Sequence, residues 1–134
     1  MVIVILGKSE RMRAALQAVL ESRIQAQAIC SADVAQTAAW MLAGRQPALV
    51  VVDCWSTSGH ALAETLQQVS MQWPEAHSLV LAETALDCRV ARTLGADETL
   101  LHDPSAVQLF AAIDRLMPAG QPAAKENRAA PGWV

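Results

Sequence analysis

The hydrophobic positions of this chain follow two patterns, short continuous apolar runs and longer segments with apolar residues three and four positions apart. The runs at 2–6 (VIVIL), 48–53 (ALVVVD) and 78–82 (SLVLA) indicate strands covered on both faces, because a strand with one exposed face shows alternation instead. A weaker strand is predicted at 24–30, and a fifth strand at 96–102.

Segments with helical spacing separate these strands. They predict a helix at 9–22 and a second helix that is capped by Ser31 or Asp33 and ends at Gly44. Further helices are predicted over the stripe from Leu62 to the helix-ending Pro74, at 86–94, and from Asp103-Pro104 onward. The last helix is expected to be capped by Asp103, with Pro104 at its first position. Its predicted buried stripe is Val107, Phe110, Ala111, Ile113 and Met117.

Five strand–helix units in succession predict a doubly wound α/β fold, because short parallel strands need right-handed helical crossovers. The expected architecture is a three-layer α/β/α sandwich around a five-stranded parallel sheet. Residues 1–118 are assigned to this domain. The segment 119–134 has no apolar period and is rich in Ala and Pro, so it is expected to be a flexible tail.

Composition narrows the class of protein. The chain is 53% hydrophobic and 17% charged, with a net charge of −3, which excludes a wholly disordered chain and offers no broad basic surface for nucleic acid or an anionic membrane. Its apolar runs are far shorter than the roughly 18 residues of a membrane span, and no signal peptide is evident. We therefore expect a cytoplasmic protein, with its three cysteines reduced.

In doubly wound sheets, ligands gather at the carboxyl ends of the strands. At these ends, the motifs of known enzyme classes are incomplete. Gly-Lys-Ser at 7–9 lacks the earlier glycine of a phosphate-binding loop, since Val2 stands there. Asp53 has Trp55 where a second acid would be needed for phosphatase chemistry, and the three histidines lack metal-ligand spacing. The sequence predicts neither an enzyme nor a metal site.

Three segments carry a resemblance to a known family: PALVVVD at 47–53, ERMRAALQAVLE at 10–21 and LGADETLLHDP at 94–104. Together they resemble the receiver domain of two-component response regulators, over about residues 1–117. The resemblance implies the flavodoxin-like, CheY-like fold.

It also implies a set of site positions. Receivers are phosphorylated on an aspartate that ends the third strand, and Asp53 matches it. Two acids after the first strand hold Mg²⁺ in the family, but Gly7 and Lys8 stand in their places. Ala82 occupies the position of the switch hydroxyl, and His102 that of the fifth-strand lysine. No cofactor is expected, and Mg²⁺ only if Asp53 is a working phosphoacceptor.

Replacing two acids by a glycine and a lysine changes the local charge from −2 to +1. Mg²⁺ prefers oxygen ligands, and phosphoryl transfer needs its charge. One hypothesis is that Lys8 replaces the metal by pairing with Asp53, which would lock one conformation. The alternative is that Lys8 points to solvent while Asp53 bonds to backbone.

The first functional hypothesis is a stand-alone, phosphorylation-independent receiver-like module of a phosphorelay or a derived pathway. The sequence after 118 leaves no room for an output domain, so we expect contact with a kinase or another signalling protein, or self-association. In the family the usual partner surface comprises the fourth helix, fifth strand and fifth helix. Its candidate residues here are Leu86, Arg89, Leu109 and Leu116.

Two alternatives remain open. The chain could be a true receiver phosphorylated on Asp53. It could instead be a small-molecule sensor or enzyme that uses the strand-end crevice, with Trp55 and Glu83 beside Lys8 and Asp53.

Overall fold

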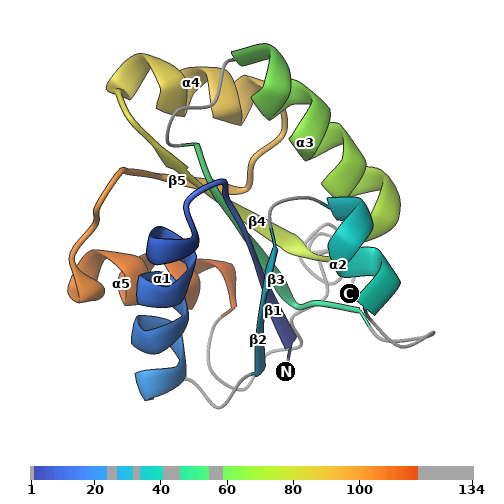
Figure 1. Ribbon diagram of the computed structural model, residues 1–134. Coiled ribbons are helices and arrows are strands. Elements are labelled where there is room, and N and C mark those ends of the chain that lie inside the picture. Colours follow the sequence, from blue (N-terminus) through green and yellow to red (C-terminus); the bar gives the residue numbers. More distant parts are fainter. Residues whose placement is uncertain (1, 24–26, 32–33, 41–45, 55–58, 118–134) are drawn as a thin grey trace, which may run out of the picture.

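The computed structural model describes residues 2–23, 27–31, 34–40, 46–54 and 59–117. Strands and helices alternate strictly along the chain (Figure 1). Their bounds are β1 Val2–Leu6, α1 Glu10–Arg23, β2 Gln27–Ser31, α2 Val34–Trp40, β3 Leu49–Asp53, α3 Gly59–Gln72, β4 His77–Ala82, α4 Ala85–Thr93, β5 Glu98–Leu101 and α5 Ala106–Leu116.

The five strands form one parallel sheet in the order β2-β1-β3-β4-β5. Helices cover both of its faces, with α1 and α5 on one side and α2, α3 and α4 on the other (Figure 1). This arrangement confirms the predicted three-layer, doubly wound α/β sandwich.

Burial explains why the central strands lack alternation. Every residue of β1, β3 and β4 is buried. Successive side chains of a strand enter opposite layers, and accordingly Val51 packs in the α1/α5 cluster while Val50 and Val52 pack in the α2/α3/α4 cluster. Each central strand thus contributes to two hydrophobic cores.

The last helix differs from its prediction at both its start and its buried face. Ser105, not Asp103, is the N-cap of α5, and it forms a reciprocal capping box with Gln108. Asp103 instead adopts a positive φ of 59°, so it cannot act as the cap.

The buried face of α5 is also rotated from the predicted stripe. Phe110 and Ile113 are buried as expected, whereas Val107 is 77% exposed and Ala111 is exposed. The positions facing the sheet are Leu109, Phe110, Ala112, Ile113 and Leu116.

The predicted tail at 119–134 lies outside the described residues, so its assignment stays a prediction. Among the described helices, none has both the length and the hydropathy that crossing a membrane requires.

Candidate functional site

The sheet's register brings the sequence-predicted site positions together at its carboxyl edge. Leu6 pairs with Val52 across β1 and β3, and Asp53 pairs with Leu81 across β3 and β4. Gly7, Asp53, Ala82 and His102 follow or end these strands and β5. Positions that are far apart in the sequence therefore share one edge.

Asp53 is buried there. The residue is 4% exposed, and the side chain with its carboxylate only 1%. Gly7 lies directly against it, since a Cβ on Gly7 would stand 3.1 Å from the Asp53 Cβ. The Arg13 guanidinium donates to the Gly7 carbonyl, which fixes the chain at this point. Where receiver domains have the first of the two acids, this chain therefore has a glycine whose backbone lies close to Asp53.

His102 is the described residue that forms an ion-pair contact with Asp53. Its Nε2 lies 3.8 Å from the Asp53 Oδ1, and its side chain is 20% exposed. This distance is too long for a hydrogen bond, so the contact is electrostatic and carries full charge only when the imidazole is protonated. The backbone N–H of His102 donates to the Ala82 carbonyl at 2.6 Å, which holds the residue beside β4.

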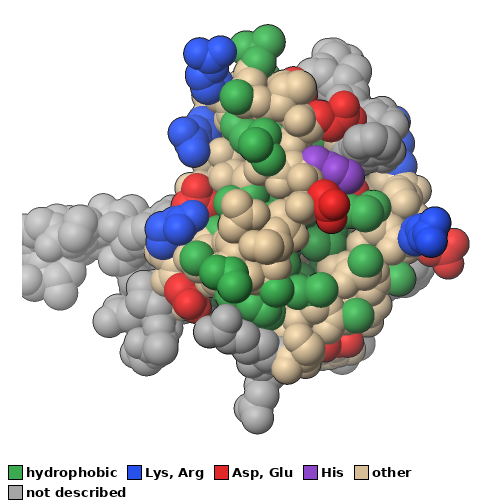
Figure 2. Space-filling model, turned by 90° about the vertical axis from the view of Figure 1, so that its left-hand side faces the viewer, with side chains coloured by type: hydrophobic (Ala, Val, Ile, Leu, Met, Phe, Trp, Pro, Cys, Tyr) green, Lys and Arg blue, Asp and Glu red, His purple; other side chains and the backbone are tan. Residues whose placement is uncertain are grey.

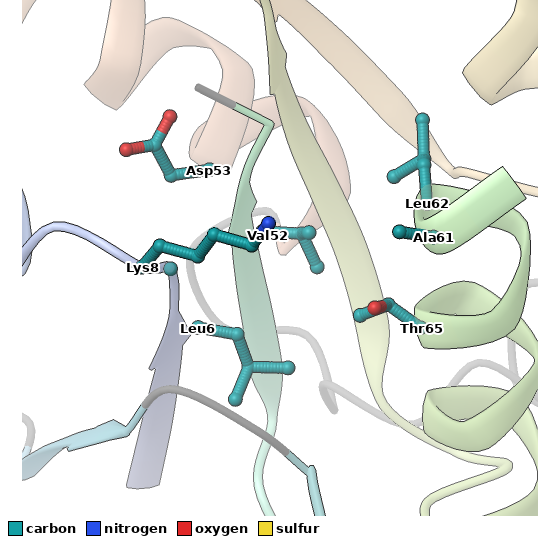
Figure 3. A pocket seen from close by; sticks show the side chains of 8 residues that line it. Leu6, Lys8, Val52, Asp53, Ala61, Leu62 and Thr65 are labelled. Atoms are coloured by element: carbon teal, nitrogen blue, oxygen red, sulfur yellow. The ribbon is translucent and has the colours of Figure 1, made fainter. Parts of the chain in front are cut away.

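Lys8 forms no ion pair with Asp53 within the described part of the chain, so the first of the two hypotheses for Lys8 is wrong. Figure 3 shows the Lys8 side chain extending toward Val52 and α3, with its amino nitrogen away from the Asp53 carboxylate. Strand alternation explains this direction, because Leu6 faces the α3 layer and Lys8 follows two residues later. The hypothesis assumed that opposite charges at neighbouring strand ends would pair, whatever the direction of the side chains.

The exposed Lys8 instead lines a small open pocket between the strand ends and α3. Leu6, Val52, Leu62 and Thr65 line it with Lys8, and Asp53 lies at its edge (Figure 3).

Receiver domains bind Mg²⁺ at the position of this site. Mg²⁺ is held by several oxygen ligands that compensate its charge. Asp53 is the carboxylate at the end of β3, while Gly7 offers no side chain and Lys8 carries a positive charge. Within the described residues, no group of three or more His, Cys, Asp or Glu could hold a metal ion. This donor set does not fit Mg²⁺.

At the end of β4, where receiver domains carry the switch hydroxyl, this chain has no hydroxyl group. Ala82 is fully buried, and Glu83 after it is exposed. The hydroxyl of Thr84 accepts from the Asp87 N–H and caps α4. Trp55 lies outside the described residues.

The sequence suggests that Cys54 is a small buried residue rather than a nucleophile, and Cys54 is not among the predicted site residues. Its N–H donates to the Leu81 carbonyl at 2.9 Å, which extends β3 along β4. Burial, together with the nearby Asp53, Asp87 and Cys88, raises the pKa of this thiol to about 12. No motif surrounds it, but the alternation of 50, 52 and 54 could have placed it in the core.

The predicted partner surface needs a correction. Leu109 and Leu116 are 2% and 5% exposed and pack in the α1/α5 core, because α5 turns them toward the sheet. Leu86 is 60% exposed, and Arg89 is exposed as well. The other large hydrophobic residues exposed on α4, β5 and α5 are Val90, Leu101 and Val107.

Figure 2 shows the side of the molecule that carries β5 and α5, where hydrophobic side chains lie among charged ones. We call Leu86, Val90, Leu101 and Val107 the apolar face.

Comparison with known proteins places the fold. No protein-family profile matches the chain, and no curated protein sequence does. Among solved structures, a response regulator signal receiver domain from Bermanella marisrubri has a TM-score of 0.70 at 19% identity, covering 86% of this chain and 96% of that one. A response regulator from Thermotoga maritima has a TM-score of 0.66 at 15% identity, covering 85% and 94%.

A chain described as a pilus assembly protein (cpaE) from Burkholderia thailandensis is similar to the same degree. Its TM-score is 0.70 at 14% identity, and the match covers 86% of this chain and 96% of that one. The fold is therefore the one found in response-regulator receiver domains, as the resemblance implied.

Proposed function

We propose that this chain is a receiver-like signalling module that acts by binding another protein, without phosphorylation of Asp53. The observation that carries the proposal is the burial of the Asp53 carboxylate, which is 1% exposed at the position of the family's phosphoacceptor. A phosphoryl donor must reach this carboxylate, and cationic groups must neutralise the charge that develops.

The surroundings of Asp53 support the same conclusion. Gly7 approaches so closely that a Cβ there would already be in tight contact. The Lys8 amino group points toward α3, so it does not replace the metal (Figure 3). The His102 imidazole lies 3.8 Å from the carboxylate. This arrangement favours a site fixed in one state.

The apolar face supports action through protein contact. Leu101 and Val107 are 55% and 77% exposed on adjacent elements, and Leu86 on α4 is 60% exposed. Large apolar side chains that are more than half exposed are candidates for contact with another protein. The partner we infer is a kinase or another signalling protein of a phosphorelay or a derived pathway, or a second copy of the chain. The proposal assigns no reaction and no cofactor to the chain.

The test is an amide NMR titration with Mg²⁺, followed by beryllofluoride, which mimics the phosphoryl group on receiver aspartates. We expect unchanged resonances at Asp53, Ala82, Thr84 and His102 at millimolar Mg²⁺. The Asp53→Asn variant is the matched control for any non-specific effect of the reagent. Shifts that are absent in this control and spread to α5 would establish a working receiver and overturn the proposal.

One observation favours a second candidate, a sensor of small anions. The Lys8 amine and the Thr65 hydroxyl line the same pocket (Figure 3). Tryptophan fluorescence with a panel of phosphorylated and carboxylated metabolites, without Mg²⁺, tests this function. Quenching that is lost in Lys8→Ala would support it, and a flat response across the panel would eliminate it.

A further inference from the structure

Cys54 lies in the core on the α2/α3/α4 side of the sheet. The alternation of β3 sends Val50, Val52 and Cys54 into one cluster, which also contains Ala91 of α4. Cys54 stands one residue beyond the end of β3, with its backbone paired to β4. It is therefore the member of this row nearest the carboxyl edge, and it is 4% exposed.

Cys88 lies in the first half of α4. It precedes Ala91 by three positions, so the two share a face of the helix. Ala91 is fully buried in the cluster that contains Cys54, while Cys88 is half-buried. A crossover helix runs back along the sheet, so the step from Ala91 to Cys88 leads toward the carboxyl edge. The Cys88 thiol is also close enough to act on the pKa of Cys54.

We propose that Cys54 and Cys88 form a redox-active pair, in which oxidation by a peroxide joins the end of β3 to the first half of α4 through a disulfide. Both cysteines are free thiols in this structure. Cys30 is excluded from the pair because it packs on the opposite side of the sheet, with its thiol near the Gln17 amide oxygen of α1.

The half-buried Cys88 is the residue that meets the oxidant. Its thiolate attacks one peroxide oxygen, the S–O bond forms, the O–O bond breaks, and the released hydroxide takes a proton to become water. The Cys54 sulfur then attacks the sulfenic sulfur of Cys88. The S–S bond forms, the S–O bond breaks, and the hydroxide leaves with the Cys54 proton as a second water. Two thiols are oxidised and one hydrogen peroxide is reduced to two waters.

The environment of Cys54 predicts which step is slow. Only the thiolate attacks rapidly, and burial holds the Cys54 thiol in its neutral form, with a pKa of about 12. The sulfenic acid on Cys88 should therefore accumulate at neutral pH, and the disulfide should close faster as the pH rises.

The disulfide would have a mechanical consequence for α4. This helix also carries Leu86 and Val90 of the apolar face, so a covalent tie would restrict the part of the face that it presents. This consequence rests on the proposed function, whereas the disulfide itself does not. Mass spectrometry tests the disulfide and the beryllofluoride titration tests the function, so either can fail alone.

The experiment treats the full chain with hydrogen peroxide, blocks the remaining thiols and digests after Lys, Arg and Glu. This cleavage places Cys54 in peptide 46–64, Cys88 in 84–89 and Cys30 in 24–45. We expect peptides 46–64 and 84–89 as one species, two hydrogens lighter than their sum, in the wild type and in Cys30→Ser. We expect none in Cys54→Ala, where dimedone should label Cys88 more extensively than in the wild type.

A disulfide requires Cα atoms within about 7 Å of each other, so its formation reports directly on the approach of α4 to β3. Slower amide hydrogen exchange in α4 of the oxidised wild type is the expected second readout. Dimedone labelling of Cys88 at the same level in the wild type and in Cys54→Ala, with no linked peptides, would overturn the proposal. So would a linked species that contains Cys30.

Discussion

At the residue scale, Gly7 makes the most direct contact with the buried carboxylate of Asp53. A Cβ at this position would stand 3.1 Å from the Asp53 Cβ and 3.7 Å from its Oδ2. An alanine therefore needs a shift of a few tenths of an ångström, and an aspartate adds a like charge beside a carboxylate that is already out of water.

We expect Gly7→Ala to lower the free energy of unfolding by about 1 kcal/mol, in the range of mild overpacking, and Gly7→Asp to lower it further. Lys8→Asp, at an exposed position, should stay within about 0.5 kcal/mol of the wild type. Urea unfolding of the three variants is the measurement. A Gly7→Asp protein as stable as the wild type would show that the edge opens readily to admit a second carboxylate.

The raised pKa of the Cys54 thiol leads to a separate prediction, about the stability of the fold at alkaline pH. Its pKa rises from 9.0 to about 12 in the folded protein, mainly through burial. Above pH 9 the unfolded chain therefore loses this proton while the folded chain keeps it, and stability falls as the pH rises. The slope approaches about 1.4 kcal/mol per pH unit for one group.

The measurement is urea unfolding at pH 8 and pH 10, compared between the wild type and Cys54→Ala. The wild type should lose about 1 kcal/mol more than the variant over this interval, since the variant keeps every other titrating group. Equal losses in the two proteins would mean that the folded thiol ionises as readily as the unfolded one.

Some of the site could be predicted from single residues, and some could not. The resemblance located Asp53 and His102, and the register of the sheet brings them to 3.8 Å. The direction of Lys8 was available in principle from the alternation of β1, but charge complementarity suggested the opposite. The closeness of Gly7 to Asp53 depends on the spacing of two strand ends, which no local pattern encodes.

At the scale of the element, α5 shows how a correct helix can be assigned the wrong face. Apolar residues occur almost all around it, so Val107-Phe110-Ala111 and Leu109-Ala112-Leu116 both satisfy helical spacing. Packing against β1, β3 and β4 selects the second set. Contact with the sheet decided between them, and that information is not local.

The cap of α5 can be tested independently of its buried face. Ser105 accepts from the Gln108 N–H at 3.1 Å, and the Gln108 side chain accepts from the Ser105 N–H at 3.0 Å. Ser105→Ala should lower the free energy of unfolding by about 1 kcal/mol, as the loss of a cap does elsewhere. Asp103→Gly is the matched control, because it removes the expected cap and suits the positive φ.

Thermal or urea unfolding of the two variants separates the assignments. We expect Asp103→Gly to be as stable as the wild type or slightly more so. If Asp103→Gly greatly lowered the free energy of unfolding and Ser105→Ala left it unchanged, Asp103 would be the cap, as the sequence suggested.

At the scale of the whole molecule, the three layers could be predicted from sequence, because strands covered by helices on both faces are apolar at every position. Continuous runs such as 2–6 and 48–53 can be stable only with helices on both faces. The strand order, in contrast, depends on which crossovers pass over which face. The sequence carried it only through the resemblance to receiver domains, which share the fold.

The structure changes the assignment of residues to the core and to the apolar face. This assignment leads to the last prediction. Leu109→Ala removes a side chain that is 2% exposed, and such losses cost about 2–5 kcal/mol because a cavity remains. Leu101→Glu and Val107→Glu alter side chains that are 55% and 77% exposed, so each should change the free energy of unfolding by less than about 0.5 kcal/mol.

If the apolar face binds a second copy of the chain, sedimentation velocity over a range of concentrations should show association in the wild type and in Leu109→Ala wherever that variant is folded. The Leu101→Glu/Val107→Glu double variant should remain monomeric at every concentration, because each copy would bury charge against the other. A wild type that is monomeric throughout would exclude self-association and leave a different protein as the occupant. A double variant that associates as the wild type does would move the contact away from β5 and α5 altogether.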